Sequence, residues 1–102
     1  MLIHFDDQDY EFDFDEVEVG QADQIKRKYG ITLLGIERGL LDVDSEALRC
    51  MYWLMLAQNG KRVNIDTLQF KPVKLAKAIN DAMLKENEKA AAAEDPKPET
   101  AE

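Results

Sequence analysis

An apolar run in the middle of the chain limits how the rest of it can fold. From Ala47 to Ala57, eleven consecutive residues include one charged side chain, Arg49. A helix of this composition has no continuous polar face, so its own domain or a partner must cover it on more than one side. We expect a central helix here, capped by Asp44 and followed by Gly60.

The N-terminal segment has the two-residue period of a β-hairpin. Aromatic residues alternate with acids from Tyr10 to Phe14, which predicts a strand with one buried face. A preceding strand would pair with it through a turn at residues 6–9. The inward-facing side chains of the two strands would be Ile3, Phe5, Tyr10, Phe12 and Phe14.

The acids of this segment also have the spacing of ligands in a helix–loop–helix calcium site. They occupy the first, third, fifth, ninth and twelfth positions of such a loop: Asp7, Asp9, Glu11, Asp15 and Glu18. The loop needs Gly at its sixth position for a sharp turn, but Phe12 stands there. We therefore favour the hairpin, with its acids on a solvated face, and expect no metal site.

The apolar spacing becomes helical after the hairpin. A short helix would bury Ile25 and end at Gly30. Thr32 would cap a second helix, TLLGIERGLLD, which Gly35 and Gly39 weaken. The inward residues of this second helix would be Leu33, Ile36 and Leu40.

A last helix and a tail complete the chain. Pro72 suits the first turn of a helix, and from Glu88 onward no large apolar residue occurs. The apolar stripe of this helix would be Val73, Ala76, Ile79 and Met83. The sequence predicts an α+β fold, in which an N-terminal β-hairpin packs against three to four helices. Residues 1–87 would form one small domain, and residues 88–102 a frayed helix end and a flexible, disordered acidic tail rich in Ala and Pro.

Charge and apolar content narrow the classes of partner. The net charge is −8, and residues 1–25 hold nine of the 21 acids and none of the 13 basic residues. This field repels phosphate backbones and attracts basic proteins, so we expect a protein partner and no nucleic acid. No apolar run is long enough to cross a bilayer, and the opening MLIHFDDQ does not resemble a secretory signal. The single Cys50 suits the reducing cytosol.

Few residues have catalytic or ligating chemistry. His4 is the single histidine, which excludes a two-histidine metal site. Cys50 could act as a nucleophile with His4 as its base, but it lies in the apolar run, where we expect it to be buried. No glycine loop follows a predicted strand in the way that phosphate sites require. We therefore expect a protein that is not an enzyme and that has no cofactor.

Four features occur in a fixed order over about residues 10–70. They are the acidic strand that ends in Glu18-Val19-Gly20, the helix that runs into Gly30-Ile31-Thr32-Leu33, the run around Tyr52-Trp53-Leu54, and the Asn59-Gly60 stop followed by Val63, Ile65 and Asp66. This order resembles the tail assembly chaperones of long-tailed, siphovirus-type bacteriophages. The helix that starts at Pro72 departs from the looser acidic segments associated with that family.

The resemblance implies a non-enzymatic protein of the cytoplasm of the infected host, absent from the mature virion. Such a chaperone binds the tape measure protein, keeps it soluble and helps to recruit tail tube subunits. To bind a long helical client with apolar stripes, the chaperone needs an apolar contact surface, and charged residues elsewhere on its surface keep the complex soluble. A second hypothesis is an acidic inhibitor or nucleic-acid mimic that acts on a basic partner.

The apolar run is the candidate contact surface. Either both of its faces are internal, or one face docks a partner helix or a second copy of the chain. The candidate partner-binding residues are Arg49, Met51, Tyr52, Trp53, Met55 and Leu56.

Overall fold

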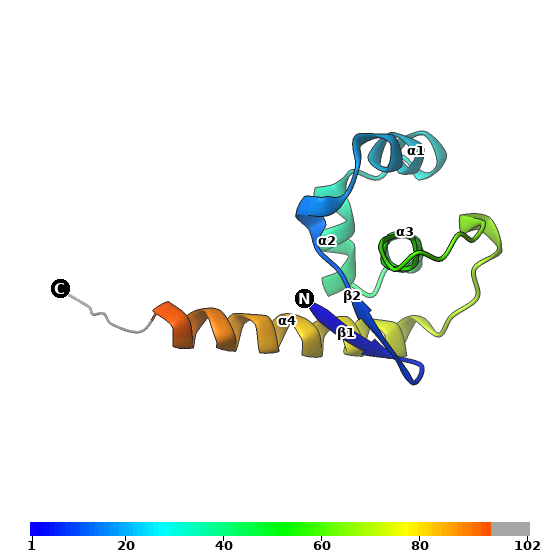
Figure 1. The fold of residues 1–102 in the computed structure, drawn as a ribbon. Coiled ribbons are helices and arrows are strands. Elements are labelled where there is room, and N and C mark those ends of the chain that lie inside the picture. The colour runs from blue at the N-terminus through cyan, green and yellow to red at the C-terminus, as the bar shows by residue number, and fades with distance from the viewer. Residues whose placement is uncertain (95–102) are drawn as a thin grey trace.

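The structure, a computed structural model, describes residues 1–94, with side chains through residue 88. It has the predicted α+β fold, a two-stranded hairpin packed against four helices (Figure 1). Its elements in chain order are β1 (Leu2–Phe5), β2 (Gln8–Glu11), η1 (Phe14–Glu16), α1 (Val19–Tyr29), α2 (Leu33–Leu41), α3 (Ser45–Gln58), η2 (Ile65–Thr67) and α4 (Pro72–Glu94).

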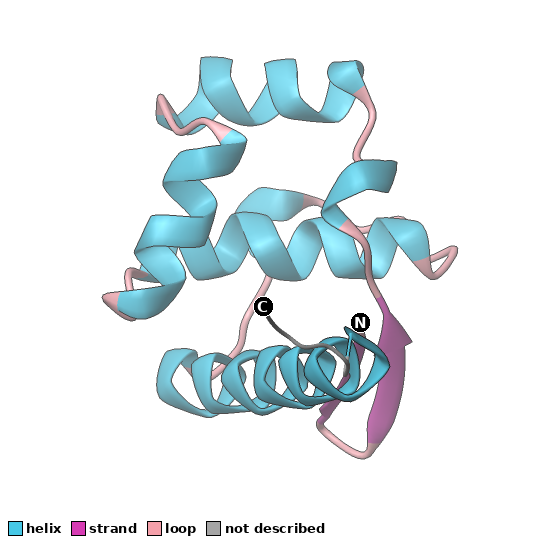
Figure 2. Cartoon of the chain, turned by 90° about the vertical axis from the view of Figure 1, so that its left-hand side faces the viewer, coloured by secondary structure: helices cyan, strands magenta, loops and turns pink. Residues whose placement is uncertain are grey.

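The helix α3, formed by the apolar run, lies at the centre of the molecule. It contacts β2, α1, α2, η2 and α4, and Figure 2 shows it between α1 above and α4 below. Seven of its side chains are buried, and they are Ala47, Leu48, Cys50, Met51, Leu54, Met55 and Leu56. The absence of a polar face on α3 is thus explained by neighbours on several sides.

The hairpin is confirmed, but its turn is shorter than predicted. Phe5 lies opposite Gln8 in an antiparallel pair, so the turn consists of Asp6 and Asp7 alone. Both aspartates have a left-handed backbone conformation, with φ of 53° and 63°. A two-residue turn between twisted strands requires this conformation. Aspartate tolerates this conformation because its short side chain can hydrogen-bond locally. Residues 8 and 9 of the predicted turn belong to β2.

Phe12 and Phe14 are not strand residues, contrary to the prediction. β2 ends at Glu11, and the Asp13 carboxylate accepts a hydrogen bond of 2.9 Å from the Asp15 amide, which starts the 3-10 turn η1. The Phe14 ring packs edge-on against buried Phe12, with 4.9 Å between the centroids. All five predicted inward residues are nevertheless buried or half-buried: Ile3, Phe5, Tyr10, Phe12 and Phe14.

Two side-chain amides at the end of α3 complete the outer edge of β2. Asn59 Nδ2 donates to the Glu11 carbonyl at 2.9 Å, and Gln58 Nε2 donates to the Asp13 carbonyl at 2.9 Å. The Asp13 amide donates in return to Gln58 Oε1 at 3.0 Å. Backbone groups that would otherwise stay open at a strand edge are therefore paired.

The ends of the helices follow the predicted caps. Gly30 ends α1 with φ of 71°. The Thr32 hydroxyl accepts a hydrogen bond from the Gly35 amide at 3.0 Å, and the Asp44 carboxylate accepts one from the Ala47 amide at 2.9 Å. These side chains satisfy amides that have no partner within the first turn of a helix.

The last helix begins at Pro72 as predicted, but it is turned differently. Val73, a member of the predicted stripe, is 57% exposed. The buried side chains of α4 are Leu75, Ala76, Ile79 and Ala82. The sequence allows two overlapping stripes that share Ala76 and Ile79, and packing on β1 and α3 selects the stripe with Leu75.

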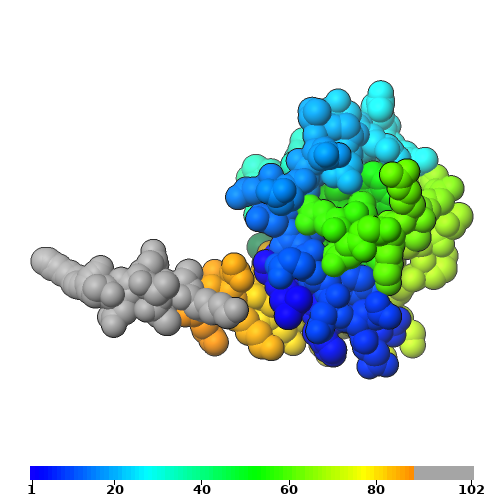
Figure 3. All heavy atoms as spheres, viewed as in Figure 1, coloured from blue at the N-terminus to red at the C-terminus, as the bar shows by residue number. Residues whose placement is uncertain are grey.

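The helix α4 is also longer than predicted. It continues through residue 87, the predicted domain boundary, to Glu94. Its C-terminal part leaves the body of the molecule as a projecting arm (Figure 1), and Figure 3 shows the yellow and orange part of α4 beside the blue N-terminal hairpin. The alanines at positions 90–93 are strong helix formers, which accounts for the continuation. The rest of the predicted tail, residues 95–102, lies outside the described residues.

Candidate partner-binding surfaces

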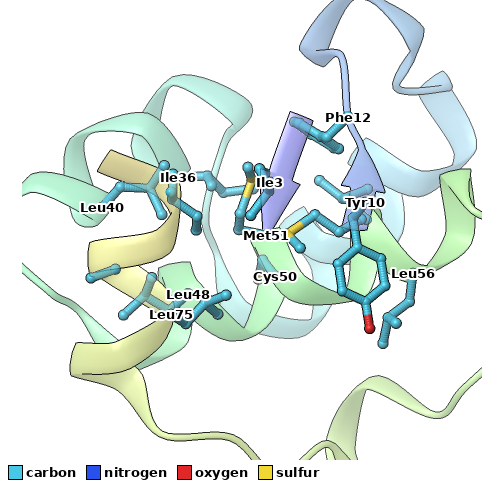
Figure 4. Packing of buried hydrophobic residues seen from close by; sticks show 14 of the residues in the cluster. Ile3, Tyr10, Phe12, Ile36, Leu40, Leu48, Cys50, Met51, Leu56 and Leu75 are labelled. Atoms are coloured by element: carbon cyan, nitrogen blue, oxygen red, sulfur yellow. The ribbon is translucent and has the colours of Figure 1, made fainter. Parts of the chain in front are cut away.

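Three of the six candidate contact residues are core residues. Met51 and Met55 are 0% exposed and Leu56 is 5% exposed. Figure 4 shows Met51 beside Ile3 and Leu56 beside Tyr10, both residues of the hairpin. The structure places these three residues in the core, where the neighbours of α3 cover them, so a partner reaches them only if those neighbours move.

Arg49 holds the connection between α3 and α4. Its Nη1 donates to the carbonyl of Ile65 at 3.1 Å and to that of Leu68 at 2.8 Å. Its Cζ also lies 5.9 Å from the centroid of the Phe70 ring, within the range of a cation–π contact. The one charge of the apolar run thus has a structural role.

Trp53 and Tyr52 are half-buried and face different surroundings. Trp53 Nε1 donates to the Val63 carbonyl at 3.2 Å, so the indole supports the same connection. The Tyr52 ring meets Phe5 and Phe70 edge-on, with centroid distances of 5.5 and 5.7 Å. Of the six candidates, Tyr52 is the one that lines an opening at the surface.

We call this opening the aromatic cleft, and it has a volume of about 790 Å³. It lies between the hairpin turn and the N-terminal part of α4, and its apolar lining includes Phe5, Tyr52 and Phe70. Charged residues are also part of the lining: Lys71, Lys74, Lys77 and Asp81 from the α4 side, and Asp6 and Asp7 from the hairpin side. Sequence spacing did not predict this cleft, because its walls are far apart along the chain.

A second surface is the outer face of α2, which carries two exposed leucines. Leu34 is 56% exposed and Leu41 is 74% exposed. They are seven residues apart, which places them two turns apart on one side of the helix, at a separation of about 10 Å. The sequence pattern did not predict this pair as a surface, although both leucines are apolar residues outside the stripe predicted to face inward.

An acidic groove lies at the opposite end of β2 from the hairpin turn. Its volume is about 560 Å³. Four carboxylates and the end of α3 line it: Glu11, Asp13, Glu16 and Glu18, with Ala57 and Gln58. The C-terminal end of a helix adds partial negative charge, so this groove favours basic groups. Among the side chains that the structure describes, those of residues 1–88, no cluster of three or more ligating groups is placed to hold a metal ion.

Two groups with shifted pKa values lie outside these surfaces. Burial raises the pKa of the Cys50 thiol to about 11, so the thiolate needed for nucleophilic attack is scarce at neutral pH. Hydrogen bonds from Lys28 and Tyr29 lower the pKa of Asp66, and the Lys28 ammonium lies 2.7 Å from its carboxylate. This ion pair joins the end of α1 to η2.

Among the helices that the structure describes, none combines the length and the apolar character needed to cross a bilayer. Comparison with protein-family models, curated proteins and solved structures finds no match to this chain.

Proposed function

We propose that this protein is a tail assembly chaperone of a long-tailed, siphovirus-type bacteriophage. It binds the tape measure protein, keeps that protein soluble and helps to recruit tail tube subunits in the cytoplasm of the infected host. It acts by binding, without a catalytic step, and leaves before the virion is complete. The ordered resemblance over about residues 10–70 supports this proposal, and the outer face of α2 supplies the contact surface.

The outer face of α2 is the observation that carries the proposal. Successive residues of a helix are rotated by about 100°, which places Leu34 and Leu41 about 20° from each other and about 100–160° away from the buried Ile36 and Leu40. While α2 packs on α3 through Ile36 and Leu40, the outer pair stays exposed. A partner can cover this pair, and leucines seven residues apart match the heptad repeat of a helical client.

Co-expression with the tape measure protein tests this contact. Replacing Leu34 and Leu41 together by Ser should send the tape measure protein into the insoluble fraction. The matched control replaces Val19 and Leu84 by Ser, since these residues are 78% and 60% exposed on other helices. A Leu34→Ser/Leu41→Ser protein that is folded by circular dichroism and still solubilises the client would contradict the proposal.

The acidic groove supports the alternative of an acidic inhibitor that acts on a basic partner. The variant Glu11→Gln/Asp13→Asn/Glu16→Gln/Glu18→Gln removes the charge of the groove and keeps side chains that can still cap and pair. If the protein is a chaperone, this variant should retain the client and associate with it more slowly. Loss of client binding in this variant, with the α2 variant still binding, would favour the inhibitor.

A further inference from the structure

The aromatic cleft has charged walls of opposite sign. On the α4 side, Lys71, Lys74 and Lys77 follow one another at a spacing of three residues, and Asp81 ends the row. On the hairpin side stand Asp6 and Asp7. The ion pairs among the described residues involve other groups, so these six charges face the cleft without a close partner of opposite charge there.

The length and lining of the cleft fit one helix. From Lys71 to Asp81 the α4 side extends for about 15 Å, or roughly three helical turns. Ala78, which also lines the cleft, has a small side chain that allows another helix to approach α4 closely. Between the charged walls, the rings of Phe5, Tyr52 and Phe70 offer apolar surface to a stripe of leucine-like side chains.

We infer that the aromatic cleft docks one amphipathic helix of a protein partner. The apolar stripe of this helix packs on the three rings, its carboxylates lie along the lysines of α4, and its basic residues face the two aspartates of the hairpin turn. The inference rests on the proposed function, because it gives a helical client a second, charged contact besides the outer face of α2. Walls of opposite sign also fix the direction in which the helix lies, since the reversed helix places like charges together.

A synthetic peptide serves as the probe. It has about 20 residues, enough to form a helix, with a leucine stripe, Glu along one flank and Lys along the other. A second peptide has the same stripe and Gln on both flanks. Titration into the full-length, isotope-labelled protein should shift the amide resonances of residues 5–7 and 70–81. The charged peptide should bind more tightly than the Gln peptide, and this difference should shrink as salt rises.

Charge reversal on the α4 side tests the role of the lysines. The variant Lys71→Glu/Lys74→Glu/Lys77→Glu should bind the charged peptide at least about tenfold more weakly than the unmodified protein does. The helix should remain folded in this variant, because two of the new acids lie at the start of α4, where acids favour a helix. The matched control, Lys26→Glu/Arg27→Glu/Lys85→Glu, changes the net charge equally outside the cleft and should bind within about twofold of the unmodified protein. Equal affinity of the two variants, or peptide-induced shifts confined to α2, would overturn the inference.

The hairpin side is tested separately. In Asp6→Asn/Asp7→Asn the left-handed turn is retained, because Asn suits it as well as Asp. This variant should bind the charged peptide severalfold more weakly than the unmodified protein does, and its affinity for the Gln peptide should be unchanged. Unchanged affinity for both peptides would contradict the two-sided arrangement. If the cleft variants retain the tape measure protein and lose no peptide affinity, the inference fails and the proposed function stands. If the peptide binds in the cleft and the tape measure protein is not retained by the unmodified chain, the proposed function fails instead.

Discussion

Gly39 sets how closely α2 and α3 approach, and replacing it by Ala tests this packing. A Cβ added at Gly39 would lie 2.3 Å from the Cβ of Ala47 and 3.4 Å from that of Asp44. Carbon atoms prefer separations of about 3.5–4.0 Å, so the two helices must separate by more than about 1 Å. Overpacking of this kind lowers the free energy of unfolding by about 1–3 kcal/mol, and the higher helix propensity of Ala raises it by about 1 kcal/mol.

Gly20 provides the matched control. It lies in α1, and a Cβ added there meets no atom within 4 Å. Gly20→Ala should therefore stabilise the protein by about 0.5–1 kcal/mol, whereas Gly39→Ala should destabilise it by about 1 kcal/mol. In a domain of this size, 1 kcal/mol corresponds to a change in Tm of about 4–8 °C. Thermal unfolding followed by circular dichroism at 222 nm measures both changes.

A double mutant separates the clash from other effects. Ala47→Gly removes the opposing Cβ, so Gly39→Ala should cost less in the Ala47→Gly background than in the unmodified chain. The coupling between the two sites should be at least about 0.5 kcal/mol. If Gly39→Ala stabilises the protein as much as Gly20→Ala does, the close approach of the two helices is refuted.

Three further predictions concern single side chains. Arg49→Met should lower the free energy of unfolding in urea by about 1.5–3 kcal/mol, because two charged hydrogen bonds to backbone carbonyls are lost; a loss below about 0.5 kcal/mol would contradict this role. Lys28 and Tyr29 lower the pKa of Asp66, so its stabilising contribution is present above the unfolded-state value of 3.8 and is lost as pH falls through the folded-state value. The stability difference between the unmodified protein and Asp66→Asn should therefore shrink on acidification, and a constant difference would refute the ion pair. At pH 8, Cys50 should react with iodoacetamide at least about tenfold more slowly in the folded protein than in urea, and equal rates would show that the thiol is accessible.

Local chemistry made several elements predictable. Thr32 and Asp44 each stand before a helix because their side chains accept hydrogen bonds from its first turn. Gly30 ends α1 because it adopts a left-handed conformation at no steric cost. These signals depend on neighbours within a few residues, so they can be seen in the sequence without knowledge of the fold.

Features that depend on distant residues were not predictable. Whether α4 buries the stripe with Val73 or the stripe with Leu75 depends on how the preceding connection orients the helix against β1. That connection is held by Arg49, which lies in another helix. The aromatic cleft has the same origin, because Phe5, Tyr52 and Phe70 come from three segments that only the tertiary fold brings together.

The contrast between α3 and α2 shows why apolar content alone does not identify a contact surface. Both helices have apolar residues on more than one side, and α3 is the richer of the two. In α3 these sides are covered, because the hairpin, α1, α2 and α4 all pack on it. In α2 the buried side rests on α3, while Leu34 and Leu41 face away from the body and stay exposed. The number of packed neighbours therefore decides which apolar side chains stay exposed and available to a partner. The helix α3 has neighbours on several sides and is largely covered, whereas α2 leaves Leu34 and Leu41 exposed.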